Sequence, residues 1–285
     1  MDEQAQHDER PVVISVRDLS VRFHRTRRHR SIRDLIFKGE SGVRAGEFWA
    51  LRNVTFDVRE GEAIGLVGRN GQGKSTLLKV VAGVMMPDQG TVKVEGGVAP
   101  LIEITGGFVG DLTVRDNIHL TAGLHGMAKK DIEERFDDIV DFAEVEKFLD
   151  TPYKHLSSGM KVRVAFAVVS RLEEPIMLVD EVLAVGDRAF KLKCNARIEE
   201  LLAAGRTFFL VSHNARDLKT YCQRALYIHQ GKIIMDASVD QVLEQYDEDT
   251  GQAARRRARQ ERKRKRRRER RRRQAAEQKA QKKLK

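Results

Sequence analysis

The segment GRNGQGKST at positions 68–76 constrains the fold of this 285-residue chain more than any other feature. It matches the pattern G-x-x-x-x-G-K-[ST], with an apolar run at 63–67 before it and the helix-like LLKVVAG after it. Gly68, Gly71 and Gly73 let the backbone curl around an anion, so that successive N–H groups point inward beside the positive end of the following helix. We therefore predict a strand, a phosphate-binding loop and a helix in succession.

Two side chains of this loop and two acids further along the chain have the chemistry that phosphoryl transfer requires. We expect Lys74 to bridge the β- and γ-phosphates of a nucleotide and Ser75 to hold Mg²⁺ through its hydroxyl. Asp180 and Glu181 follow the apolar run IMLV, and an acid at the carboxyl end of a buried strand lies over the nucleotide crevice of an open sheet. Asp180 is expected to bind Mg²⁺ through water, and Glu181 to orient or deprotonate the attacking water.

The rest of the pattern predicts an α/β layer fold, because strand-like and helix-like segments alternate. Apolar residues recur at spacings of three and four from Ile132 to Ala143, which predicts an amphipathic helix. Alternating apolar positions over 12–23 predict a strand with a turn at Asp18. The other expected elements are strands at 53–58, 176–180 and 207–212, a helix over 159–172, and a hairpin over 224–236 turning at Gln230-Gly231.

The charge of the chain is divided between two regions. Residues 251–285 hold 19 of the 53 basic residues but only three of the 42 acidic ones, so the net charge of +11 becomes −5 for residues 1–250. We expect a mildly acidic globular body with a basic tail, not a basic nucleic-acid-binding fold. The two cysteines exclude a disulfide framework and a four-cysteine zinc site. No apolar run approaches the roughly 18 residues of a membrane span.

Two further motifs complete an order that is specific to one family. The signature LSSGM at 156–160 opens a helix before Asp180, and Ser212-His213 ends another apolar run. A phosphate loop, a Ser-Gly signature, an Asp-Glu pair and a lone histidine, in this order over about residues 12–240, resemble the ATP-binding cassette (ABC) ATPases.

The resemblance implies a fold and a division of the chain. The fold is an α/β P-loop NTPase nucleotide-binding domain with an antiparallel β subdomain and a helical subdomain. The domain is expected over residues 1–250, with the helical subdomain at about 107–172. Residues 251–285 are expected to form an Arg/Lys-rich tail that is disordered or partly helical.

The family works as a head-to-tail dimer that encloses two ATP molecules, and this implies a role for several residues. Phe23 would stack on adenine, and Thr76 would contact the α-phosphate. Ser157 and Gly159 would reach the γ-phosphate of ATP on the partner, and Asp187 would communicate across the dimer. Catalysis is assigned to Glu181 and His213, and Mg²⁺ binding to Ser75, Asp180 and Glu103. The nucleotide-binding set is Phe23, Gly68, Asn70, Gly71, Gly73, Lys74, Ser75, Thr76, Ser157, Ser158, Gly159 and Asp187.

Three positions depart from the usual family pattern. The signature is commonly L-S-G-G-Q, but here Ser158 replaces the first glycine and Met160 replaces the glutamine. Glu103 lies where the family carries a glutamine ligand to Mg²⁺, so it offers an oxygen but adds negative charge beside the metal. With the stretch DEVLAVGD at 180–187, these departures resemble the branch that exports O-antigen, teichoic acid and other lipid-linked cell-surface polysaccharides.

That branch implies both partners and a location. A multi-spanning permease would hold a homodimer of ATPase subunits at the cytoplasmic face of a bacterial cell membrane, as peripheral proteins. The permease surface is expected to include the Glu103 loop and the segment 107–145. The tail at 251–285 has no apolar stripe, so we expect electrostatic attachment to anionic lipids rather than insertion. The basic insert at 25–38 is either a solvated loop or a second segment that attaches to anionic lipids.

Two alternative functions remain open from sequence. The chain could be a cassette ATPase for another cargo, or a soluble one acting on ribosomes or nucleic acid through its tail. Nucleic acid is the less favoured partner, because the tail has no aromatic residues to stack on bases. The motifs do not identify the glycan.

Overall fold

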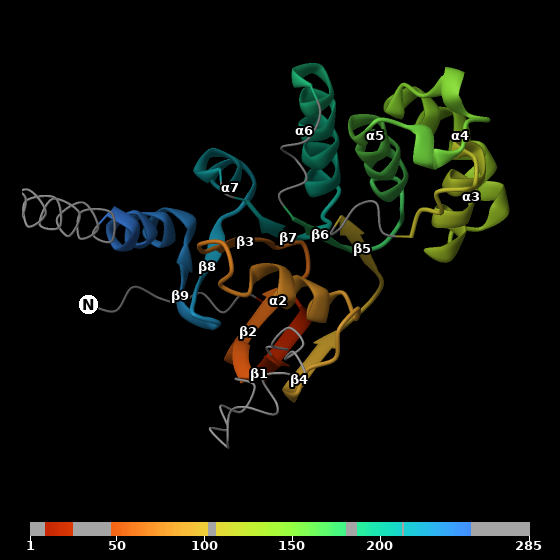
Figure 1. The fold of residues 1–285 in the computed structure, drawn as a ribbon. Coiled ribbons are helices and arrows are strands. Elements are labelled where there is room, and N and C mark those ends of the chain that lie inside the picture. The colour runs from red at the N-terminus through yellow and green to blue at the C-terminus, as the bar shows by residue number, and fades with distance from the viewer. Residues whose placement is uncertain (1–8, 25–46, 102–106, 181–186, 213, 252–285) are drawn as a thin grey trace, which may run out of the picture.

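The structure is a computed structural model that describes residues 9–24, 47–101, 107–180, 187–212 and 214–251 (Figure 1). Its helices are α2 (Lys74–Val81), α3 (Val114–Leu124), α4 (Lys129–Ala143), α5 (Ser158–Val169), α6 (Arg188–Ala203) and α7 (Ala215–Tyr221), with 3₁₀ turns η1 (Glu146–Phe148) and η2 (Tyr153–His155) and a last helical stretch over 239–251. Among these residues no helix is long and apolar enough to cross a bilayer.

The larger sheet has six strands in the order β5-β6-β7-β3-β8-β9. These are β5 (Val98–Leu101), β6 (Ile176–Val179), β7 (Thr207–Val211), β3 (Ala63–Val67), β8 (Arg224–His229) and β9 (Lys232–Ser238). All neighbours are parallel except β8 and β9, which form the expected hairpin. Every residue of β3, β6 and β7 is buried, as parallel strands covered on both faces require. The predicted α/β fold and these core strands are confirmed.

The smaller sheet is antiparallel, in the order β2-β1-β4. It contains β1 (Val12–His24), β2 (Glu47–Arg59) and β4 (Gln89–Val94). The turn expected at Asp18 is wrong, because β1 continues through it. Asp18 has a φ of 49° and the pairing shifts between Val16 and Leu19, so the irregularity is a bulge. Its backbone N–H donates to Thr55 Oγ1 at 2.9 Å.

The larger sheet separates two apolar layers, because its strand side chains alternate between its faces. On one face, Ile64 and Leu66 pack with Leu77 and Leu78 of α2 and with the smaller sheet. On the other face, strand residues such as Val67 pack against α5, α6 and α7 (Figure 1). Helices α2 and α5 therefore lie on opposite faces of one sheet.

Helices α3, α4 and α5 form a helical unit with its own apolar core. The helix expected from Ile132 to Ala143 is confirmed as α4, which begins three residues earlier. Fully buried Asn117 holds the entry to this unit. Its Oδ1 accepts from Val109 N–H at 2.7 Å, and its Nδ2 donates to the carbonyls of Val109, Leu112 and Thr113 at 2.9–3.2 Å. Residues 107–113 are thereby fixed against α3.

Candidate nucleotide-binding site

The phosphate loop lies between β3 and α2, in the order that the sequence predicts. Gly68 follows the last buried strand residue, and Gly73 ends the loop with φ 104° as the N-cap of α2. A positive φ of this size is accessible to glycine but strained for other residues. Asn70 and Gly71 are exposed, and Thr76 lies partly buried in the first turn of α2. Backbone N–H groups at the start of a helix are available to bind an anion.

Lys74 lies within the curve of this loop. Only 6% of the residue is exposed. Its Nζ donates to the carbonyl oxygens of Gly68 at 2.7 Å and Arg69 at 3.2 Å. A buried ammonium is costly unless it is hydrogen-bonded or paired with negative charge. The ammonium is therefore placed where an anion held by the loop would neutralise it.

Ser75 and Asp180 meet although 105 residues separate them in the sequence. The Ser75 hydroxyl donates to Asp180 Oδ2 at 3.2 Å. Ser75 comes from the first turn of α2, and Asp180 directly follows β6. A hydroxyl and a carboxylate are oxygen donors of the kind that Mg²⁺ prefers. The fold thus brings Lys74, Ser75 and Asp180 into one site, at the carboxyl ends of the parallel strands.

The loop is held on two sides by backbone that approaches it closely. A Cβ at Gly73 would lie 2.4 Å from the Ala50 carbonyl oxygen of β2, and one at Gly68 would lie 2.6 Å from the Ile228 carbonyl oxygen of β8. Gln72 adds polar contacts to the β8–β9 turn. The Gln72 Oε1 accepts from Gln230 N–H at 2.5 Å, and the Gln72 carbonyl oxygen accepts from Gly231 N–H at 3.2 Å. The shape of the loop is set by these neighbours as well as by its own glycines.

The signature residues lie at the N-terminus of α5. Ser157 is the N-cap, and its Oγ accepts a hydrogen bond from Met160 N–H at 3.3 Å. Ser158 and Gly159 form the first turn of the helix. Helix α5 packs on the opposite face of the larger sheet from α2, so the signature and the phosphate loop belong to helices on different faces.

Asp187 is the N-cap of α6 and belongs to a network of charged side chains. Its Oδ1 accepts from Phe190 N–H at 2.9 Å, and this bond, with the charge of Arg163, lowers its pKa below the ordinary range. Arg163 of α5 pairs with Asp187 and with Glu144, which also pairs with Lys193 of α6. The Arg163 guanidinium lies 4.9 Å from the Phe190 ring centroid. The network joins the helical unit to the N-terminus of α6.

Phe23 lies at the end of the smaller sheet, half-buried and paired with Phe48 across β1 and β2. The two rings are stacked, with centroids 5.7 Å apart and planes inclined by 24°. The sequence assigned a role to Phe23 but none to Phe48. Gln72, Arg163 and Glu144 were missed in the same way, because their partners are distant in sequence. Gln72 stands at an unspecified position of the phosphate-loop pattern.

Several predicted residues lie outside the described residues. These are Glu103, Glu181 and His213, together with the basic insert at 25–38 and the tail after residue 251. Their assignments stay predictions.

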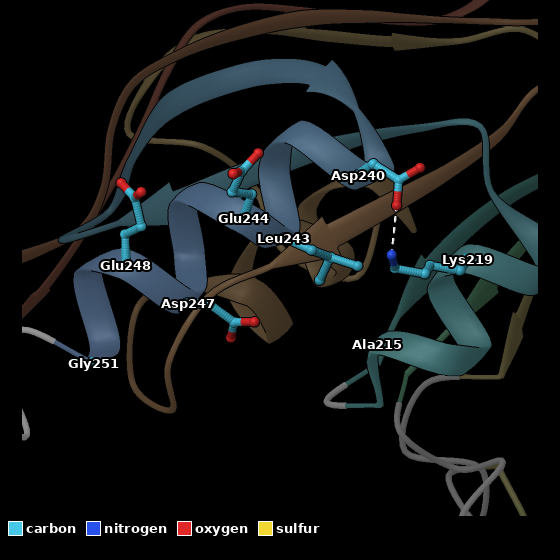
Figure 2. A pocket seen from close by; sticks show the side chains of 8 residues that line it. All are labelled: Ala215, Lys219, Asp240, Leu243, Glu244, Asp247, Glu248 and Gly251. Carbon is cyan, nitrogen blue, oxygen red and sulfur yellow. Dashed lines mark hydrogen bonds and ion pairs between the residues drawn. The ribbon is translucent and has the colours of Figure 1, made fainter.

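A separate cavity of about 810 Å³ lies between α7 and the helical stretch 239–251 (Figure 2). Its lining residues are Ala215, Lys219, Asp240, Leu243, Glu244, Asp247, Glu248 and Gly251, and none of them is a predicted site residue. Lys219 Nζ pairs with Asp240 at 2.5 Å, and the other carboxylates make this wall acidic just before the basic tail begins.

Sequence comparisons relate the chain to ATP-binding subunits of transporters. A family model described as ABC transporter matches residues 51–184. The O-antigen export system ATP-binding protein RfbB of Klebsiella pneumoniae is 41% identical over 220 residues, which cover 76% of this chain and 89% of the relative. The teichoic acids export ATP-binding protein TagH of Bacillus anthracis is 40% identical over 217 residues. That match covers 76% of this chain but only 39% of TagH.

Solved structures agree on the fold. An ATP-binding subunit of an ABC transporter superimposes with a TM-score of 0.65 and 25% identity, covering 82% of this chain and 93% of that one. A dimeric ATP-binding cassette bound to ADP and phosphate superimposes with a TM-score of 0.64 and 20% identity, covering 79% of this chain and 98% of that one.

The close approach at Gly73 predicts a graded effect of alanine in the loop. Gly73→Ala should lower the free energy of unfolding by more than about 2 kcal/mol and weaken ATP binding, because its Cβ meets Ala50 at an already strained φ. Gly71→Ala is the matched control, since its φ of 76° is similar but nothing lies within 4 Å of its Cβ; we expect about 1 kcal/mol. Urea unfolding measures the stability of each variant, and calorimetry measures its ATP affinity. Equal losses of stability in the two variants would contradict the steric argument.

The charged network predicts a pH-dependent stability. Hydrogen bonds from Lys193 and Arg163 lower the pKa of Glu144 below its ordinary value of 4.5. A lowered folded-state pKa stabilises the fold above about pH 4.5, and this contribution is lost as the pH falls through the folded value. Glu144→Gln should therefore unfold more readily than wild type at neutral pH, and the difference should vanish in acid.

Urea unfolding from pH 7 to about pH 3 measures this effect. Glu146→Gln, an exposed change two residues away, is the control and should show no such trend. If the stability difference between wild type and Glu144→Gln were the same at every pH, the charge of Glu144 would not contribute to stability.

Proposed function

This chain belongs to the family of ABC transporter ATP-binding subunits, and we propose that it drives export of a lipid-linked cell-surface polysaccharide across the cytoplasmic membrane. It is an ATPase that binds ATP. The observation that supports a polysaccharide as the cargo is the match to the O-antigen export protein over nearly the whole length of that relative. The match to the teichoic acid relative supports it, although it spans less than half of that protein.

The proposed chemistry relies on positioning and on neutralising charge. Lys74 and the amides of loop 68–73 would hold the β- and γ-phosphates and stabilise the charge that develops on them. Glu181 would align the attacking water, and His213 would contact it and the γ-phosphate. Thr76 would hold the α-phosphate, and Phe23 would stack on adenine. The contacts of the Lys74 ammonium with the loop carbonyls support this assignment.

Mg²⁺ is the proposed cofactor beside ATP. Ser75 and Asp180 would hold it, with Glu103 as a third oxygen donor, and their hydroxyl–carboxylate contact supports this choice. When bound, the ion neutralises charge on the β- and γ-phosphate oxygens.

A second copy of the chain is the proposed partner that completes the site. Ser157, Ser158 and Gly159 would bring the N-terminus of α5 to the γ-phosphate of ATP on the partner, and Asp187 would respond to it. The position of α2 and α5 on opposite faces of the sheet supports this arrangement, because each face then carries one of the two segments. Closing the dimer on ATP and opening it after hydrolysis would be the motion passed to the transporter.

A multi-spanning permease is the other proposed partner, with this chain at the cytoplasmic face of the membrane. The proposed contact surface is the Glu103 loop and the segment 107–145, where Val109, Leu112 and Leu124 are exposed apolar residues. The nucleotide-binding domain would span residues 1–250, with the helical subdomain at about 107–172. The tail at 251–285 would bind anionic lipids.

Purification from membranes tests the transport assignment. With a tag on the N-terminus, detergent-solubilised membranes should yield the chain with a stoichiometric multi-spanning permease, and an untagged strain is the control. Recovery of ribosomes or DNA that survive a moderate-salt wash, with no permease, would replace the exporter with a nucleic-acid-directed ATPase.

Two substitutions test the proposed catalytic roles. Glu181→Gln should abolish ATP turnover but preserve ATP binding, whereas Lys74→Ala should weaken both, because only Lys74 is assigned to hold the phosphates. Glu199→Gln, the same change at an exposed position of α6, should leave both unchanged. Turnover of Glu181→Gln at the wild-type rate, or normal ATP affinity of Lys74→Ala, would remove the corresponding assignment.

A further inference from the structure

Two aromatic rings lie at the end of the β1–β2 pair where β1 ends and β2 begins. Phe23 and Phe48 are directly paired in the strand register and stack with centroids 5.7 Å apart. Phe23 also packs against the apolar core between the two sheets. Phe48 is 44% exposed, which is high for so large an apolar side chain. The Phe23 ring therefore contacts both the core and one exposed aromatic side chain.

This aromatic pair is close to the phosphate loop along β2. Ala50 and Leu51, two and three residues after Phe48, are the residues that a Cβ at Gly73 would meet. Leu51 pairs with Val21 of β1, two residues before Phe23. The strand that carries Phe48 therefore continues directly into the backbone that supports the loop.

Different side chains support the other face of the same strand ends. Successive residues of a strand point to opposite faces, so Arg22 and Trp49 lie on the face away from the two phenylalanines. The Arg22 guanidinium lies 5.5 Å from the Trp49 ring centroid and pairs with Glu47 at 3.1 Å. The Arg22 N–H donates to Asp88 Oδ2 at 2.7 Å. These contacts hold the strand backbone independently of Phe48.

We infer that Phe48 is a positioning residue for the nucleobase: it stacks on Phe23 and keeps that ring in the plane in which it receives adenine. The inference rests on the proposed role of Phe23. Among the described residues, Phe48 is the aromatic partner of Phe23, and without it the Phe23 ring would be less ordered before a nucleotide binds. An ordered ring avoids that entropic cost, so Phe48 contributes to affinity without contacting the nucleotide.

Calorimetry with ADP and with pyrophosphate separates a base effect from a phosphate effect. Phe48→Ala should weaken ADP binding about two- to tenfold, the range expected for one aromatic pair, and leave pyrophosphate binding unchanged. Phe48→Tyr, which keeps the ring, should bind ADP as wild type does. Trp49→Leu is the matched control on the opposite face and should change neither affinity.

A double-mutant cycle tests whether Phe48 acts through Phe23. Phe23→Ala should lower ADP affinity, and Phe23→Ala with Phe48→Ala should lower it no further. The inference is overturned if Phe48→Ala binds ADP like wild type, if the two losses multiply, or if Trp49→Leu reproduces the loss. If Phe23→Ala itself keeps full ADP affinity, the proposed adenine contact fails as well. If Phe23→Ala loses ADP affinity but Phe48→Ala does not, only the role of Phe48 is removed.

Discussion

The close packing of the phosphate loop between β2 and the β8–β9 hairpin is the constraint on which the rest of the structure depends. Backbone oxygens of Ala50 and Ile228 occupy the space that side chains at Gly73 and Gly68 would need. Side chains at these positions would force the backbone to shift, and the β3–loop–α2 unit places Lys74 on the loop carbonyls and Ser75 on Asp180 at the end of β6. Both sheets contribute to the shape of the loop, so the smaller sheet is part of the site's support.

The six-stranded sheet explains why the phosphate loop and the signature belong to helices on different faces. Its strands are apolar on both faces, so helices must cover both. Helix α2 lies on one face, and α5 lies on the other with the helical unit. A burial requirement of the sheet thus places the two helices on different faces. In our proposal, the signature of a second copy meets the nucleotide held by the phosphate loop of the first.

The apolar layers bring the helices close to one another, and long-range polar contacts fix their positions. Arg163 joins α5, the end of α4 and the N-cap of α6 through Glu144 and Asp187, and Asn117 fixes the entry to the helical unit. The residues that touch nucleotide in our proposal are therefore supported by residues that do not. Phe48 beside Phe23 is the same arrangement at the other end of the site.

Periodicity and motif spacing are local properties of the chain, and they sufficed to predict the family, the α/β class and the core strands. They also selected Lys74, Ser75 and Asp180, which lie together in the structure. The sequence placed a turn at Asp18, where pairing with both β2 and β4 keeps the strand continuous as a bulge. Only the tertiary structure brought Gln72 to the β8–β9 turn, Arg163 to Asp187 and Phe48 to Phe23. These contacts join residues distant in sequence, and their existence depends on how packed elements meet rather than on any pattern along the chain.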